Sequence, residues 1–171
     1  MKTSKKLFAV LLTLCLIFCL SVPAFAVNAQ YSTTKAFLKV MDREKAKYSY
    51  LGVNEDNKEQ INVTAKGDNK EKLEIKIFFH EDLDSVSMRS WYVISFDKAN
   101  LAKVLAAVNQ LNNDYKYVKF VVDESDYSVD AEIDCPLRDD DCAGEIAFDA
   151  LYYIEEIVDR AYPELKAFEK K

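Results

Sequence analysis

Apolar residues recur at intervals of three and four in three stretches of the chain, which is the pattern of a helix with one buried face. The first stretch predicts a helix over residues 33–46. The second begins after Asp97 and is stopped by the polar segment Asn112–Asp114, and the third fills the end of the chain. Because proline cannot donate a backbone hydrogen bond inside a helix, Pro163 predicts a bend near Ala161–Tyr162.

Between these stretches apolar and polar residues alternate with period two, which is the pattern of strands with one buried and one solvent-facing side. In the clearest case, Leu73–Phe79, four apolar residues alternate with lysine and glutamate. From Val86 to Phe96 the alternation places Tyr92 on the buried side and Trp91 on the opposite side. Further strands are predicted over residues 47–53, 61–65, 116–123 and 127–135. The order α-β-β-β-β-α-β-β-α predicts an α+β fold, an antiparallel sheet with its helices packed on one face.

The first 26 residues have the organisation of a secretory signal peptide. Three lysines precede the apolar run Leu7–Leu20, and Ala24–Ala26 form an A-x-A cleavage signal. Because this run is shorter than the roughly 20 residues that span a bilayer, cleavage after Ala26 is favoured over retention as a membrane anchor. The chain is therefore predicted to be secreted and extracellular, with no stable anchor after cleavage. Its predicted parts are a signal peptide (1–26), a flexible leader (27–32) and one α+β domain (33–171).

The chain is acidic, with a formal net charge of -6. The predicted signal peptide carries three lysines and no acidic residue, so its removal makes the charge more negative still. Nucleic acids and anionic lipids attract surfaces rich in lysine and arginine. The composition therefore argues against nucleic acid as a partner.

Two cysteines, Cys135 and Cys142, remain after the predicted cleavage, and they bracket the sequence PLRDDD. A pair of cysteines in a secreted protein predicts a disulfide. A zinc site and a pair of exchanging thiols are the alternatives. Zinc would need further ligands, but the chain has one histidine, His80, and the C-x6-C spacing differs from the C-x-x-C of redox motifs. No metal is predicted.

Catalysis would depend on His80, with Glu81 or Asp82 to orient it. This histidine lies in a charged turn at the end of a predicted strand, which is typical of a solvated side chain. The sequence contains no G-x-S-x-G, no glycine-rich phosphate loop and no H-E-x-x-H. We therefore predict no catalytic residue and no cofactor.

Over about residues 31–171 the chain resembles the YbjN-domain family, with its motifs in the second half and the order of the upstream helix and strands also matching. Asn109 and Asn112 fall in an N-x-x-N-like segment at the end of a helix, two strands follow, and the last helix closes on a D-x-x-Y-P-x-L-like tail. The tail residues are Asp159, Tyr162, Pro163 and Leu165. The resemblance implies a fold similar to type III secretion chaperones, which are small acidic modules, often dimeric, that hold an extended peptide. It implies no catalytic centre. The signal peptide and the cysteine pair depart from the family pattern.

The favoured hypothesis is a secreted, non-enzymatic module that binds a protein or peptide, with a second copy of the chain as a further candidate partner. Exposed aromatic side chains anchor such partners, and the candidates are Trp91, Phe148, Tyr152 and Tyr153. The alternative hypothesis is a carrier of a small apolar ligand with a pocket between sheet and helices. Its expected lining is Phe78, Phe96, Phe120 and Tyr153.

Overall fold

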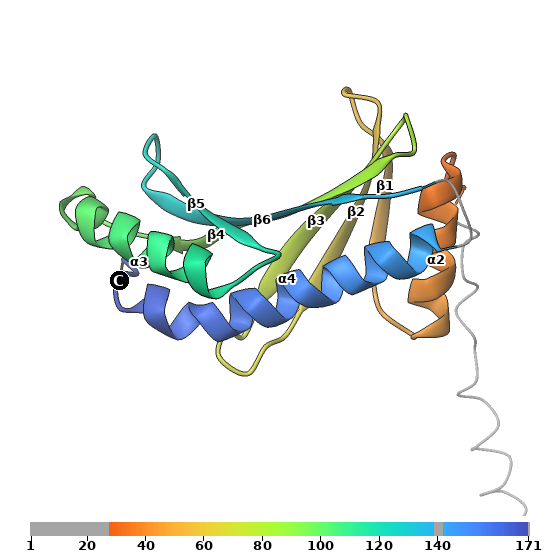
Figure 1. Ribbon diagram of the computed structural model, residues 1–171. Coiled ribbons are helices and arrows are strands. Elements are labelled where there is room, and N and C mark those ends of the chain that lie inside the picture. Colours follow the sequence, from red (N-terminus) through yellow and green to blue (C-terminus); the bar gives the residue numbers. More distant parts are fainter. Residues whose placement is uncertain (1–27, 139–141, 171) are drawn as a thin grey trace, which may run out of the picture.

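The structure is a computed structural model that describes residues 28–138 and 142–170 (Figure 1). Its elements, in chain order, are α2 (Ser32–Arg43), β1 (Ser49–Val53), β2 (Lys58–Ala65), β3 (Leu73–His80), β4 (Ser85–Ser95), the short 3-10 turn η1 (Lys98–Asn100), α3 (Leu101–Asp114), β5 (Lys119–Asp123), β6 (Ser128–Pro136) and α4 (Ala143–Lys166). This order confirms the predicted α+β fold class. The predicted signal peptide and the segment Asp139–Asp141 lie outside the described residues.

The six strands form one antiparallel sheet in the order β1-β2-β3-β4-β6-β5. Helices α2, α3 and α4 all lie on the same side of this sheet, as the apolar pattern predicts (Figure 1). The sheet is curved, so that the β1–β2, β3–β4 and β5–β6 hairpin ends bend away from the helices, whereas the β2–β3 turn lies beside α4 (Figure 1). No described helix lies over the opposite side of the sheet, which we call the open face.

The core lies between the sheet and the three helices. Leu73, Ile75, Ile77 and Phe79 of β3 are fully or almost fully buried, while Glu74, Lys76 and Phe78 alternate with them toward the open face. The ring of Phe79 packs against Phe37 of α2, with ring centroids 5.3 Å apart. Strict alternation is therefore sufficient to place this strand, because one side of it meets helices and the other meets solvent.

Helix α4 packs along the sheet and closely against α2. Gly144 lies where the two helices approach, because a Cβ atom there would lie 2.5 Å from the carbonyl oxygen of Ala36. The helix continues through Pro163 to Lys166, so the proline does not end it. None of the described helices is both long enough and apolar enough to cross a lipid bilayer.

The segment before α2 is bound to the sheet, although the sequence predicts a flexible leader there. Ala29 is buried, and the backbone N–H groups of Gln30 and Tyr31 donate to the carboxylate of Glu59 at 2.6 and 3.0 Å. The hydroxyl of Tyr50 donates to the same carboxylate. A buried glutamate on β2 thus satisfies donors at the N-terminus of α2, where the helix dipole also favours an anion.

Candidate functional site

The open face carries a mixture of aromatic, basic, acidic and amide side chains. Strand alternation and register place on it Gln60, Asn62, Lys76, Phe78, Ser87, Arg89, Asp130, Glu132 and Asp134. A solvated sheet face normally carries polar residues. Large aromatic side chains on it therefore mark a place where the surface departs from that pattern.

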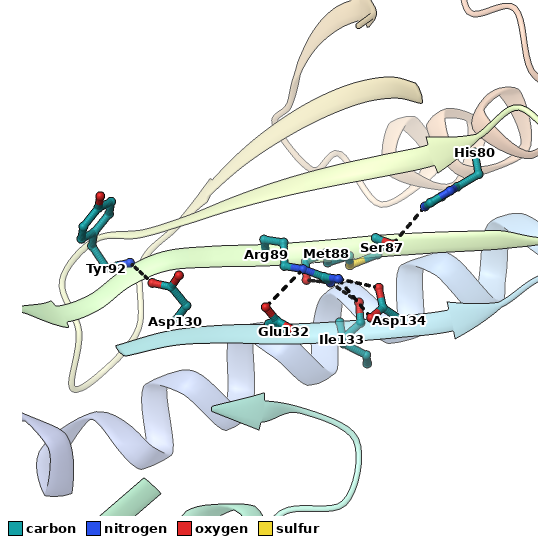
Figure 2. Close-up of polar contacts among 9 residues, drawn as sticks. All are labelled: His80, Ser87, Met88, Arg89, Tyr92, Asp130, Glu132, Ile133 and Asp134. Atoms are coloured by element: carbon teal, nitrogen blue, oxygen red, sulfur yellow. Dashed lines mark hydrogen bonds and ion pairs between the residues drawn. The ribbon is translucent and has the colours of Figure 1, made fainter. Parts of the chain in front are cut away.

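A β-bulge in β4 adds a further exposed aromatic residue, Tyr92, beside Trp91. The register between β4 and β6 shifts between Ser90 and Ile94, and Tyr92 within the bulge has a φ of 56°. The backbone N–H of Tyr92 donates to Asp130 Oδ1 at 2.8 Å (Figure 2). Bulges re-aim side chains and are common beside binding and active sites. A tyrosine with positive φ is strained, and such residues cluster at functional sites.

Because of the bulge, two consecutive aromatic residues are exposed. Trp91 is 41% exposed and Tyr92 is 59% exposed. The exposure of Trp91 agrees with its prediction, whereas the placement of Tyr92 in the buried stripe is wrong. The bulge places three residues of β4 opposite the single residue Asp130 of β6, so two extra residues interrupt the alternation here. Val93 takes the buried position instead, and Ile94 is buried as well.

Trp91 is the centre of a small platform that we define by Lys76, Phe78 and Trp91. The ring centroids of Phe78 and Trp91 are 6.3 Å apart, and the Lys76 ammonium lies 4.3 Å from the centroid of Trp91. The platform borders a shallow hollow of about 420 Å³ that also reaches Asn54 and Asp56 in the β1–β2 turn. A cation over an indole is attracted by the ring quadrupole, so Lys76 holds the indole in one orientation.

Arg89 lies beside the platform and is fixed by many contacts (Figure 2). It donates to the carbonyl oxygens of Met88 and Ile133 at 2.8 and 3.2 Å and to both oxygens of Asp134 at 2.8 and 3.0 Å. Its Nε atom also lies 3.7 Å from Glu132. A guanidinium with its donors used in this way ties β4 to β6 and adds rigidity to the face.

Asp130 is a half-buried carboxylate between the bulge and β5. Burial raises its pKa, the N–H of Tyr92 opposes this, and the nearby carboxylates of Asp126 and Asp123 raise it further. It forms no ion pair with any lysine or arginine of the described residues. The bulge is thus held by an acidic side chain that lacks a counter-ion.

His80, the only histidine of the chain, lies at the end of β3. Its Nε2 atom is 3.0 Å from Ser87 Oγ (Figure 2). Glu81 and Asp82, the suggested orienting residues, make no hydrogen bond with it. Within residues 28–138 and 142–170, no three histidine, cysteine or acidic side chains are grouped as metal ligands would be.

The remaining predicted binding residues lie on α4, across the molecule from the Trp91 platform. Phe148 is half-buried against the core, whereas Tyr152 and Tyr153 are exposed. The ring of Tyr117, from the segment between α3 and β5, stacks on Tyr153 with a centroid distance of 4.6 Å. The structure therefore brings Tyr152 and Tyr153 together with a tyrosine that sequence reasoning missed, and it separates them from Trp91.

The predicted disulfide between Cys135 and Cys142 is absent from the structure, although both residues are described. Cys135 is the second-last residue of β6, and its half-buried thiol donates to the carbonyl oxygen of Pro136 at 3.7 Å. Cys142 is exposed and lies at the N-cap of α4. Burial raises the pKa of Cys135, and so does Asp149, which lies on the second turn of α4 rather than at its start.

The four residues expected to line a ligand pocket do not meet. Phe78 lies on the open face, Phe96 and Phe120 are buried in the core, and Tyr153 is exposed on α4. No common pocket is formed by these four side chains, and the carrier hypothesis loses the lining on which it was based.

Comparison with known proteins supports the fold. No protein-family model and no curated protein sequence matches this chain. Among solved structures, YbjN from E. coli, described as a candidate transcription regulator, is similar with a TM-score of 0.57 and 11% identity. The match covers 78% of this chain and 91% of the YbjN chain. At this level of identity the likeness shows the fold alone, and the YbjN-like fold expected from the sequence is confirmed.

Proposed function

We propose that this protein is a non-enzymatic binding module that uses the open face of its sheet to hold a segment of a partner protein. The observation that carries the proposal is the Trp91 platform, in which a 41% exposed indole packs beside Phe78 and Lys76, next to the strained bulge at Tyr92. It lies on a sheet face that none of the described helices covers (Figure 1). Tryptophan and tyrosine dominate the energetics of protein interfaces when a partner covers them.

The shape and chemistry of the face favour a peptide segment over a small molecule. The hollow beside the platform is shallow and is lined by amides and charged groups as well as by Phe78 and Trp91. Small apolar ligands need concave pockets that bury most of their surface. An extended segment can instead place one apolar side chain on Trp91 and bond to the surrounding polar groups, such as Gln60 and Ser87.

We further propose that the chain belongs to the YbjN-domain family and acts outside the cell. Family membership rests on the YbjN-like fold and on the motif residues around Asn112 and Asp159. Export rests on the signal-peptide organisation of the first 26 residues. An exported module would meet other exported or surface-bound proteins, and a second copy of the chain is one of these.

Trp91 is the only tryptophan of the chain, so its fluorescence reports on the proposed site alone. Peptides tiled from candidate partner proteins would be titrated into the protein while Trp91 emission is followed, and light scattering would give the oligomeric state over the same concentrations. A binding segment should shift the emission to shorter wavelength, because it removes the half-exposed indole from water. Self-association that shifts the emission with protein concentration would identify a second copy as the partner.

The matched variants are Lys76→Ala, which removes the cation over Trp91, and Lys72→Ala, which removes an exposed lysine paired with Glu74. Binding should weaken in Lys76→Ala and stay unchanged in Lys72→Ala. Peptide binding that leaves Trp91 emission unaltered and is equal in both variants would place the binding surface elsewhere and contradict the proposal.

A further inference from the structure

Three exposed tyrosines form a continuous band across the outer side of α4. Tyr117 and Tyr153 stack with centroids 4.6 Å apart, and Tyr153 and Tyr152 are in edge contact at 6.1 Å. Their exposed fractions are 57% for Tyr117, 36% for Tyr153 and 56% for Tyr152. We call Tyr117, Tyr152 and Tyr153 the tyrosine band. Single exposed aromatic residues are ordinary, but a contiguous group of them marks an interaction surface.

At Tyr152 the band meets a hollow of about 210 Å³ between α4 and the turn that joins β2 to β3. Leu73 and the side chain of Glu155 line this hollow together with Tyr152. Glu155 follows Tyr152 by three residues, so the two side chains lie on the same side of the helix. The hollow therefore has an aromatic wall, an apolar floor and a carboxylate.

Glu155 is a half-buried acidic residue of this hollow without a partner in the part of the chain that the structure describes, whereas Asp68, which also lines it, is exposed to solvent. Glu156 is paired with Arg160 at 2.5 Å, and Asp159 accepts hydrogen bonds from the β2–β3 turn. Lys66 also lines the hollow but forms no ion pair with Glu155. Burial raises the pKa of Glu155, and no hydrogen bond or cation of the described residues opposes this. A half-buried carboxylate without a partner carries a desolvation cost that an added cation would offset.

We propose that the tyrosine band and Glu155 form a second docking surface, which takes an arginine side chain on a segment of a partner protein. A guanidinium stacks on aromatic rings and bonds to a carboxylate at the same time, which an ammonium does less well. The surface lies on the helix side of the molecule, so it is separate from the open face and independent of the function proposed for that face.

The test uses a short labelled peptide in which arginine alternates with glycine, and a matched peptide with glutamine in place of arginine. Affinity is measured by fluorescence anisotropy at two salt concentrations. The arginine peptide should bind at least several-fold more tightly than the glutamine peptide. Glu155→Gln should weaken its binding by roughly three- to tenfold, the range expected for losing a partly desolvated charge contact.

Three further variants separate this site from general attraction to an acidic protein. Glu164→Gln removes an exposed charge from the same helix and should leave affinity unchanged, because Glu164 lies outside the hollow. Tyr152→Phe keeps the ring and should bind normally, whereas Tyr152→Leu keeps an apolar group without the ring and should bind several-fold more weakly. Equal binding of the two peptides, or equal loss in Glu155→Gln and Glu164→Gln, would overturn the proposal.

Discussion

The carboxylate of Asp159 on α4 occupies the space beside Gly67 that any side chain at that position would need. A Cβ atom on Gly67 would lie 1.9 Å from Asp159 Oδ1. The same carboxylate accepts the backbone N–H groups of Asp68, Asn69 and Lys70 at 3.2, 2.9 and 2.8 Å. The turn between β2 and β3 is therefore wrapped around one acidic side chain from the far end of the chain. Glycine is needed at this position because of the close approach of Asp159, and not because of its backbone conformation, since the φ of Gly67 is not positive.

This relationship predicts that Gly67→Ala and Asp159→Ala are coupled. Each should lower the free energy of unfolding by roughly 1–3 kcal/mol, the first through the clash and the second by leaving three N–H groups without their acceptor. In the Asp159→Ala background, Gly67→Ala should cost much less, because the two nearest atoms, Oδ1 and Cγ of Asp159, are gone and only its Cβ remains, at 3.0 Å. Urea denaturation of the two single variants and the double variant measures this. Additive effects would contradict the proposed contact.

Glu59 predicts a specific dependence of stability on pH. Burial alone would raise its pKa, but the hydroxyl of Tyr50 and the N–H groups of Gln30 and Tyr31 donate to it and offset this, so the pKa is lowered. A lowered folded-state pKa means that the stabilisation is complete above the ordinary glutamate value of about 4.3 and is lost as the pH falls through the folded value. Glu59→Gln should lower stability at neutral pH and flatten its decline in acid.

The check is urea denaturation at a series of pH values from neutral to acidic, with Glu124→Gln as the control. Glu124 is exposed in the turn between β5 and β6, so its replacement should leave the profile unchanged. If Glu59→Gln and the unaltered protein lost stability in parallel as the pH falls, Glu59 would not be the residue responsible.

Asn112 protects the edge of the sheet. Its side chain accepts the N–H of Phe120 at 2.8 Å and donates to the carbonyl oxygen of Phe120 at 2.9 Å, so it occupies the two backbone groups that this residue of β5 turns away from β6. An unprotected edge strand can pair with another chain. Asn112→Ala should cost roughly 1–2 kcal/mol of stability and speed hydrogen exchange at the Phe120 amide. Asn113→Ala, at an exposed neighbouring position, should do neither. Unchanged exchange at Phe120 in Asn112→Ala would rule the role out.

These contacts show what local sequence can and cannot predict here. The alternation in β3 and the apolar stripe of α4 depend on neighbours within one element, and both were predicted correctly. Asn112 and Asp159 were noticed as motif residues, but their roles depend on backbone groups 8 and about 90 residues away. In the structure these two side chains hold a strand and a turn in place.

The candidate sites were harder to predict for the same reason. The bulge at Tyr92 depends on an acceptor from β6, Asp130, so no periodicity within β4 could reveal it. The stacking of Tyr117 on Tyr153 joins a loop to a helix that begins 26 residues later in the sequence. In the sequence, the only sign of this contact is a tyrosine-rich loop after a helix. Such a loop does not show which surface the ring of Tyr117 will cover.

The strain at Tyr92 predicts a trade between stability and binding. Tyr92→Gly removes the cost of a positive φ, because glycine adopts that conformation freely. The variant should unfold at a higher urea concentration, yet bind segments at the open face more weakly because one exposed aromatic ring is lost. Lys45→Gly is the matched control, since Lys45 has a similar φ of 57° away from this face. It should raise stability without changing binding. Loss of stability in Tyr92→Gly would show that the bulge carries no strain.

The two cysteines should differ in their reaction with a thiol reagent. The Cys135 thiol is half-buried at the end of β6, and burial together with Asp149 raises its pKa, so little of it is thiolate at neutral pH. Cys142 is exposed at the start of α4. Mass spectrometry after brief treatment of the native protein with iodoacetamide should find Cys142 modified first, and Cys135 modified at a comparable rate only in denaturant.

Protein recovered from the culture medium provides the comparison that tests the disulfide predicted from the sequence. If neither cysteine reacts in denaturant until a reductant is added, the pair is bonded after export, and the start of α4 must move toward β6 to allow it.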